Sequence, residues 1–251
     1  MSSAFDWDSG YASQRMPVFG RNVVATSHPL AAQAGLGMLM RGGNAVDAAI
    51  AAAAVLTIVE PVSNGLGSDA FCILWDGQAL HGLNASGRAP GAWTPEYFRR
   101  KHGDAATPPP RGWDSVTAPG AVAGWVALSR RFGQLAFAEL LQPAIAIAQR
   151  GHAVAWVVAR KWAAGAQTLQ AQPGFTEAFM PHGRAPEVGE LFRFAAAGRT
   201  LHLIAETNGE AFYRGEVAAA AAQHAKAHGG AMTATDFAAC EPEWVTPISQ
   251  D

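Results

Sequence analysis

The residues best suited to chemistry gather in the stretch 84–90, NASGRAP, which directly follows an apolar run typical of a β-strand. Glycine and proline frame its arginine. A guanidinium held on such a loop can bind a carboxylate through two parallel hydrogen bonds, a geometry that lysine cannot reproduce. Arg88 and Ser86 are therefore candidate substrate-binding residues. The alternative is a structural ion pair between Arg88 and a carboxylate such as Asp69.

A glycine-rich stretch, Gly65 to Ala70 (GLGSDA), formally matches the dinucleotide-binding pattern G-x-G-x-x-G/A. That pattern works when a strand precedes it and a helix follows, because the helix N-terminus meets the pyrophosphate. Here a predicted helix precedes the glycines and a predicted strand follows them. We therefore interpret the stretch as a tight loop, and we predict no cofactor.

The remaining candidate residues favour structural roles. His224 and His228 stand four apart in a helical stretch, a spacing that a metal could use, but a third ligand and an H-E-x-x-H pattern are lacking. We predict a solvated helix face and no metal site. His28 precedes a proline and is predicted to organise a turn, and Cys72 lies among apolar strand residues as an inert thiol.

Acyl transfer would need a nucleophile, a base and an oxyanion hole, and their spacing is not recognisable in this chain. A G-x-S-x-G nucleophile elbow is absent from the sequence. The residues by themselves therefore identify no catalytic residue.

The elements that must position these residues are mostly helices, since alanine and leucine recur at helical spacing. The predicted helices cover 29–40, 45–59 with Asn44 as N-cap, 119–132, 136–150, 154–169, and two pieces within 195–228. The segments AFCILW and QALHGL, joined at Asp76-Gly77, predict a β-hairpin. Proline and glycine in 101–118 predict a long loop, and the chain after DFAAC is less regular.

Composition bounds the class of protein. The chain has 251 residues and is 49% apolar and 15% charged, which predicts one globular, helix-rich α/β domain. Eighteen basic against 20 acidic residues argue against nucleic-acid binding. The longest apolar stretch, 45–59, is shorter than the ~20 residues of a membrane span. Two cysteines fit a reduced compartment, and an N-terminus without a secretory signal predicts a cytoplasmic location.

Several ordered blocks carry a resemblance to a known family. They are ATSHPLAAQAGLGMLMRGGNAVDAAIAAA, VEPVSNGLGSDAF, APGAVAGWVALSRRFGQLAFAELLQPAIAIAQRG, GEAFYRGEVAAA and GGAMTATDFAA. Together they resemble the large subunit of the gamma-glutamyltranspeptidase family, over about residues 20–245. The resemblance implies an N-terminal-nucleophile hydrolase with a four-layer αββα sandwich. It also implies a zymogen that cleaves itself and transfers acyl groups from glutathione-type gamma-glutamyl amides to water or amino acids.

The resemblance places the nucleophile outside this chain. In the family it is the first threonine of the small subunit, which lies in a stretch that this sequence does not contain. Residues 1–251 are thus expected to be the N-terminal portion of the large subunit, completed by the C-terminal small subunit. A homo-oligomer and a periplasmic location are further options that the family suggests.

The substrate loop departs from the family pattern. Aligning on Ala89-Pro90 puts Ser86 where the family has the arginine that binds the glutamyl carboxylate, with Arg88 two positions later. LNASGRAP therefore resembles the divergent branch of gamma-glutamyltranspeptidase-like proteins and cephalosporin acylases. Two alternatives to gamma-glutamyl transfer stay open: a glutaryl- or cephalosporin-type acylase, and a non-catalytic fragment that needs a partner.

Overall fold

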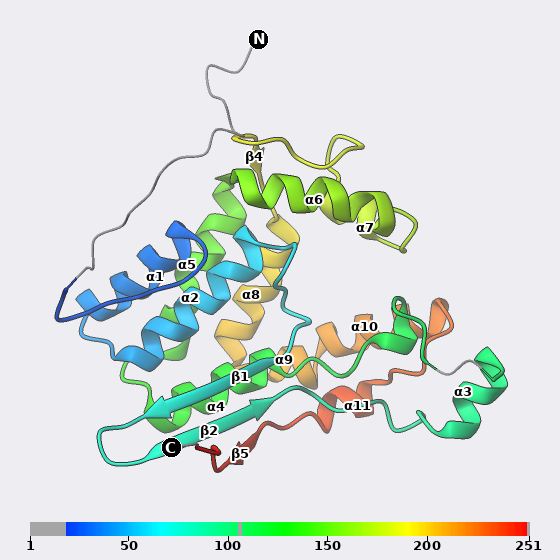
Figure 1. Ribbon diagram of the computed structural model, residues 1–251, viewed down its shortest axis with the longest axis horizontal. Helices are drawn as coiled ribbons and strands as arrows, with labels where there is room; N and C mark the ends of the chain where they lie inside the picture. The colour runs from blue at the N-terminus through cyan, green and yellow to red at the C-terminus, as the bar shows by residue number, and fades with distance from the viewer. Residues whose placement is uncertain (1–18, 105–106, 250–251) are drawn as a thin grey trace, which may run out of the picture.

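The computed structural model describes residues 19–104 and 107–249, and helices dominate it (Figure 1). The helices are α1 (Pro29–Met40), α2 (Ala45–Val59), α3 (Pro95–His102), α4 (Ala121–Phe132), α5 (Phe137–Arg150), α6 (Trp156–Leu169), α7 (Phe175–Phe179), α8 (Ala195–Thr207), α9 (Glu210–Tyr213), α10 (Glu216–Ala227) and α11 (Ala234–Ala238), with a short 3-10 helix η1 (Trp113–Ser115). The strands are β1 (Ala70–Trp75), β2 (Leu80–Ala85), β3 (His152–Ala153), β4 (Leu191–Phe192) and β5 (Glu243–Val245). This mixture of helices and small sheets agrees with the predicted α/β class.

Helix α2 runs through the main core, as predicted, because apolar residues cover most of its circumference. Its N-cap is Asn44, whose side chain accepts hydrogen bonds from the backbone N–H groups of Val46 and Asp47. The Asp47 carboxylate is fully buried. It accepts a hydrogen bond from the Asn44 N–H at 2.9 Å and another from the Gln134 N–H. One side chain thus joins the start of α2 to the loop after α4.

The larger sheet has the order β1-β2-β5, with both pairs antiparallel. The predicted β1–β2 hairpin is confirmed, with Ala70 opposite Ala85 and Trp75 opposite Leu80. The connection is longer than a two-residue turn: Asp76 accepts from the N–H groups of Gln78 and Ala79. Strand β5 was not predicted, since it has three residues and pairs with a strand far away in the sequence.

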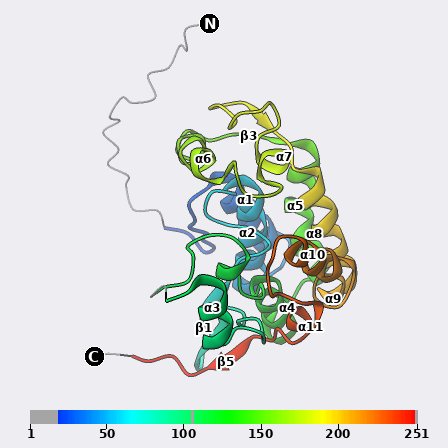
Figure 2. The ribbon, with the colours of Figure 1, turned by 90° about the vertical axis from the view of Figure 1, so that its right-hand side faces the viewer.

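The two faces of this sheet differ. Helix α4 covers one face so closely that a Cβ atom on Gly124 would lie 2.8 Å from the Cβ of Ala85. On the other face Phe71, Ile73 and Trp75 are 68%, 72% and 61% exposed. The turned view places the sheet at the edge of the molecule with α4 on its inner side (Figure 2). The hairpin therefore presents a row of large apolar side chains without cover from the described residues.

Other boundaries differ from the sequence predictions in detail. Residues 195–228 form three helices, α8, α9 and α10, rather than two, because Asn208 and Gly209 both adopt positive φ and end α8. Helices α3 and α11 were not predicted, and α3 enters the stretch interpreted as loop. No helix within the described ranges is long and apolar enough to cross a membrane.

A pair of buried histidines lies where α1 meets the β3–β4 ladder. His28 caps α1, its Nδ1 accepting from the Leu30 N–H at 3.2 Å, so the predicted structural role is confirmed. The ring of His152 is 6.5 Å from that of His28 and only 5% exposed. Neither ring nitrogen of His152 has a hydrogen-bond partner among the described residues. Such a ring is costly to protonate.

This pair predicts acid sensitivity of the fold. Burial, assisted by the nearby His28, lowers the pKa of His152 to about 4, below the value of about 6.5 in an unfolded chain. The contribution of neutral His152 to the free energy of unfolding is therefore fully present above about pH 6.5 and is lost as the pH falls toward 4. Chemical denaturation should show a loss of about 2 kcal/mol between pH 7 and pH 5 from this residue.

The His152→Phe variant should lose that part of the pH dependence. Identical pH slopes for the wild type and His152→Phe would contradict this assignment.

Candidate functional site

The two predicted substrate-binding residues lie just beyond the end of β2, beside the chain that enters β1. Because Ala70 pairs with Ala85, the segment Ser68-Asp69 lies next to Ser86 at the same end of the hairpin. The N–H of Ala121, the first residue of α4, donates to the Ser68 carbonyl at 3.0 Å. The site is thus built from two strand ends and one helix start.

Ser86 and Arg88 differ in exposure. Ser86 is half-buried, and its N–H donates to the Asn84 side chain at 3.0 Å, which bends the chain out of the strand. Arg88 is exposed. The structure does not show the alternative pairing of Arg88 with Asp69: within residues 19–104 and 107–249 neither side chain forms an ion pair. The guanidinium can therefore bind a carboxylate from outside.

The loop that carries these residues is held by close contact between its backbone and the backbone of segment 118–120. Gly87 has φ +79°, and a Cβ atom there would lie 1.8 Å from the Ala118 carbonyl oxygen. A Cβ on Gly120 would lie 2.1 Å from the Ala85 carbonyl oxygen. We call this contact, of Gly87 against Ala118 and of Gly120 against Ala85, the glycine crossing. Only glycine fits at its two key positions.

Buried side chains brace the glycine crossing from behind. The Tyr213 hydroxyl donates to the Pro119 carbonyl at 2.7 Å and accepts from the Ala123 N–H at 2.8 Å. Burial raises the pKa of Tyr213, so the hydroxyl keeps its proton. Cys240 Sγ lies 3.4 Å from the same Pro119 carbonyl. Segment 118–120 is therefore fixed on both sides.

Neither cysteine is suited to be a nucleophile. Burial raises the pKa of the Cys240 thiol and of the Cys72 thiol, which disfavours the reactive thiolate. Cys72 is half-buried on β1 and packs against the main core, in agreement with the predicted inert role.

An apolar cavity of about 480 Å³ adjoins this end of the sheet. Gly65, Gly67 and Pro119 contribute to its wall, together with aromatic residues of η1, α9 and α11: Trp113, Phe212 and Phe237. No titratable side chain of the described residues lines it. The cavity can hold apolar groups, but it cannot supply an acid or a base.

The loop GLGSDA lies between α2 and β1, so the order of helix, loop and strand is confirmed. The Gly65 N–H donates to Ser68 Oγ at 2.9 Å and closes the loop on itself. A helix N-terminus that could receive a pyrophosphate does not follow. The interpretation as a tight loop therefore holds.

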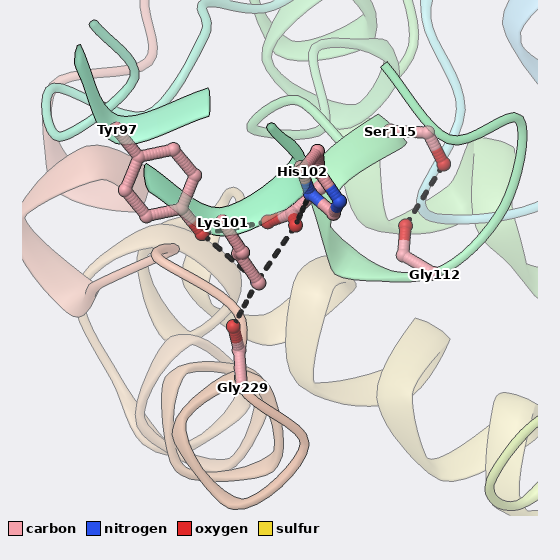
Figure 3. Close-up of polar contacts among 7 residues, drawn as sticks. Tyr97, Lys101, His102, Gly112, Ser115 and Gly229 are labelled. Carbon is pink, nitrogen blue, oxygen red and sulfur yellow. Dashed lines mark hydrogen bonds and ion pairs between the residues drawn. The ribbon is translucent and has the colours of Figure 1, made fainter. Parts of the chain in front are cut away.

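Sequence reasoning missed a polar cluster around Asp114, three members of which, Tyr97, Lys101 and His102, are labelled in Figure 3. Asp114 lies on η1 and is 5% exposed. Its carboxylate accepts hydrogen bonds from the Tyr97 hydroxyl and from His102 Nε2, both at 2.7 Å, and pairs with Lys101 Nζ at 2.6 Å. Burial alone would raise the pKa of Asp114, but these hydrogen bonds outweigh it and hold the pKa below its usual range. We call these four residues the Asp114 cluster. The spacing of Tyr97 and Lys101 on one helix face was the available signal.

The paired histidines of α10 lie close together but are poorly arranged for a metal. Their ring centroids are 4.3 Å apart. His224 Nδ1 accepts a hydrogen bond from Trp113 Nε1 at 3.1 Å, which occupies the lone pair that a metal would need. In the described part of the chain, no group of three or more potential metal ligands is found.

Comparisons with known proteins agree on one family. The family model described as "Gamma-glutamyltranspeptidase" matches residues 31–251. The chain is 36% identical over 234 residues to the glutathione hydrolase-like YwrD proenzyme of Bacillus subtilis, covering 92% of this chain and 44% of that protein. It is 46% identical to the crystal structure of cephalosporin acylase from Bacillus halodurans, with a TM-score of 0.86 over 97% of this chain and 48% of that one.

A more distant solved structure shares the same fold. The gamma-glutamyltranspeptidase of Helicobacter pylori is 27% identical, with a TM-score of 0.86 over 93% of this chain and 68% of that one. The chain therefore spans about half the length of its nearer relatives named here. Its higher identity with the cephalosporin acylase agrees with the divergent branch that LNASGRAP indicates.

The glycine crossing predicts a sharp contrast between two glycines of this site. Gly87→Ala should lower the free energy of unfolding by at least ~2 kcal/mol, because alanine is strained at positive φ and its Cβ would overlap the Ala118 carbonyl. Gly67→Ala is the control, since nothing lies within 4 Å of a Cβ there. Chemical denaturation of both variants tests this, and equal stabilities would contradict the crossing.

Proposed function

This chain belongs to the gamma-glutamyltranspeptidase family, and we propose that the complete protein cleaves amides whose acyl group carries a carboxylate, passing the acyl group to water or to an amine. The family supports the reaction class. The observation that supports the substrate class is Arg88, an exposed guanidinium without an ion pair in the described ranges, on a loop locked by the glycine crossing. A guanidinium carried on such a loop can bind a carboxylate in a bidentate manner.

In this proposal the chain supplies binding, and the rest of the protein supplies the nucleophile. The described titratable groups near the site are either engaged, as in the Asp114 cluster, or carry no adjacent base. We propose that a threonine in the part outside this chain attacks the amide carbonyl, with its own α-amine as the base. Arg88 would hold the acyl carboxylate, and Ser86 Oγ would donate one further hydrogen bond to it.

The uncovered face of the sheet supports a partner from the same precursor. Phe71, Ile73 and Trp75 alternate along β1 and are all more than half exposed. A contiguous apolar surface of this kind marks an interface. The four-layer αββα sandwich expected from the resemblance would bring a second sheet onto this face. We propose that the remaining polypeptide, including the small subunit, covers it after self-cleavage of the precursor.

A glutaryl or cephalosporin-type acyl group is the second candidate substrate. The 46% identity with a cephalosporin acylase favours it. Both acyl groups carry the carboxylate that Arg88 would bind. The gamma-glutamyl group also carries an α-amino group, which the glutaryl group lacks. Parallel assays of the full-length protein with gamma-glutamyl and glutaryl anilides separate the two, since the preferred acyl group should show the larger kcat/KM.

The Arg88→Ala variant of the full-length protein tests the substrate class. Loss of a charge-assisted bidentate contact, worth about 1.5–3 kcal/mol, should raise KM for acidic acyl amides about 10- to 100-fold. The KM for a neutral acyl amide should not change. Arg99→Ala is the matched control, because Arg99 is exposed on α3 and its one ion pair within the described ranges is with Glu96, at 3.5 Å. Equal KM values for wild type and Arg88→Ala would overturn the role of Arg88.

A further inference from the structure

Residues 88–118 leave the candidate site and return to it, so that the two ends of the segment meet there. We call this segment the excursion. The Ala118 N–H donates to the Arg88 carbonyl at 2.8 Å and joins the ends. Between them the chain forms α3, which lies at one end of the molecule (Figure 1), and η1, whose Trp113 packs against the main core. The conformation of Arg88 therefore depends on what holds this excursion in place.

Apolar burial contributes little to the anchoring of α3. None of the residues of α3 is buried, and the last turn of the helix is basic. Its aromatic contacts, such as Trp93 on Phe98 with centroids 5.4 Å apart, stay within the excursion. Most of the hydrophobic driving force that holds an ordinary helix is absent here. Polar contacts must therefore attach α3, whereas η1 is also held by Trp113, which packs against the main core.

The Asp114 cluster is the centre of those polar contacts. The carboxylate of η1 binds three side chains of α3, so it ties the outgoing half of the excursion to the returning half. Lys101 also donates to the Gly229 carbonyl just after α10, which attaches the cluster to the main body (Figure 3). Asp114 lies four residues before Ala118, the partner of the Arg88 carbonyl.

A second attachment restrains the outgoing half close to Arg88. The Gly91 N–H donates to Asp236 Oδ1 at 2.8 Å, and Asp236 forms the capping box of α11 with Thr233. Arg88 is thus held between Ala118 on one side and Gly91 on the other. Movement of α3 relative to η1 would disturb both hydrogen bonds, the one from Ala118 to the Arg88 carbonyl and the one from Gly91 to Asp236.

We propose that Asp114 is a positioning residue for Arg88: by joining α3 to η1 it fixes the excursion so that the guanidinium meets the acyl carboxylate of the substrate. This role rests on the proposed function. Asp114 is not a proton donor or acceptor for the reaction, because its carboxylate is buried and already accepts three hydrogen bonds.

The Asp114→Asn variant of the full-length protein tests this role by kinetics. Asparagine keeps the size of the side chain but loses the charge that binds Lys101 and His102. The KM for acidic acyl amides should rise about tenfold, while kcat and the KM for neutral acyl amides stay within about twofold. Asp104→Asn, in the same excursion and exposed, is the control and should match the wild type.

A double-mutant cycle separates positioning from general destabilisation. If Asp114 acts through Arg88, Asp114→Asn should raise the acidic-substrate KM no further once Arg88 is alanine. Additive effects of the two substitutions would overturn the proposal. Hydrogen exchange gives a readout without substrate: Asp114→Asn, but not Asp104→Asn, should speed exchange of the Gly91 and Ala118 amides at least tenfold. Unchanged exchange would also overturn it.

The outcomes distinguish this inference from the function on which it rests. A wild-type protein without amide hydrolysis would overturn the proposed function, and this role with it. Hydrolysis by the wild type with an unchanged ratio of acidic to neutral KM in Asp114→Asn would overturn the positioning role alone.

Discussion

The glycine crossing is the contact on which the candidate site depends. Where Gly87 meets Ala118 and Gly120 meets Ala85, two backbones approach so closely that any side chain would force them apart. That approach lets β2 end directly against the start of α4 and turns the chain outward at Ser86. Tyr213 and Cys240 fix the returning segment from the core side. The position of Arg88 is therefore set by sterics and buried hydrogen bonds together, rather than by its own side-chain contacts.

The molecule divides into a part held by apolar packing and a part held by polar contacts. The main core centres on α2 and includes residues of α1, α4, α5 and α8 to α11. Within the excursion 88–118, helix α3 buries no residue and is tied to η1 by the carboxylate of Asp114. The candidate site with Ser86 and Arg88 lies between these two parts. The exposed row of Phe71, Ile73 and Trp75 on β1 adds a third feature, an apolar surface without cover from the described residues.

The sequence predicted the elements whose signals are local. Helix α2 and its cap Asn44 follow from periodicity and capping chemistry, and the β1–β2 hairpin from alternating apolar residues around Asp76-Gly77. Helix α3 was missed because it buries no residue and so shows no apolar stripe. Strand β5 and the Asp114 cluster need partners that are distant in sequence, which a single chain does not reveal. The loop with Ser86 and Arg88 follows β2, as the apolar run before it indicated, and its role in substrate binding stays a prediction. The alternative ion pair between Arg88 and Asp69 is not formed among the described residues, and both residues are exposed.

The proposed function requires this chain to be one part of a self-processing, amide-cleaving precursor whose nucleophile lies in another part. An intact-mass time course on the full-length gene product, purified without truncation, tests this requirement. We expect a single precursor to convert into two species that stay associated, the smaller one beginning with threonine. A precursor of constant mass that never divides, under conditions in which it is folded, would contradict the proposed function.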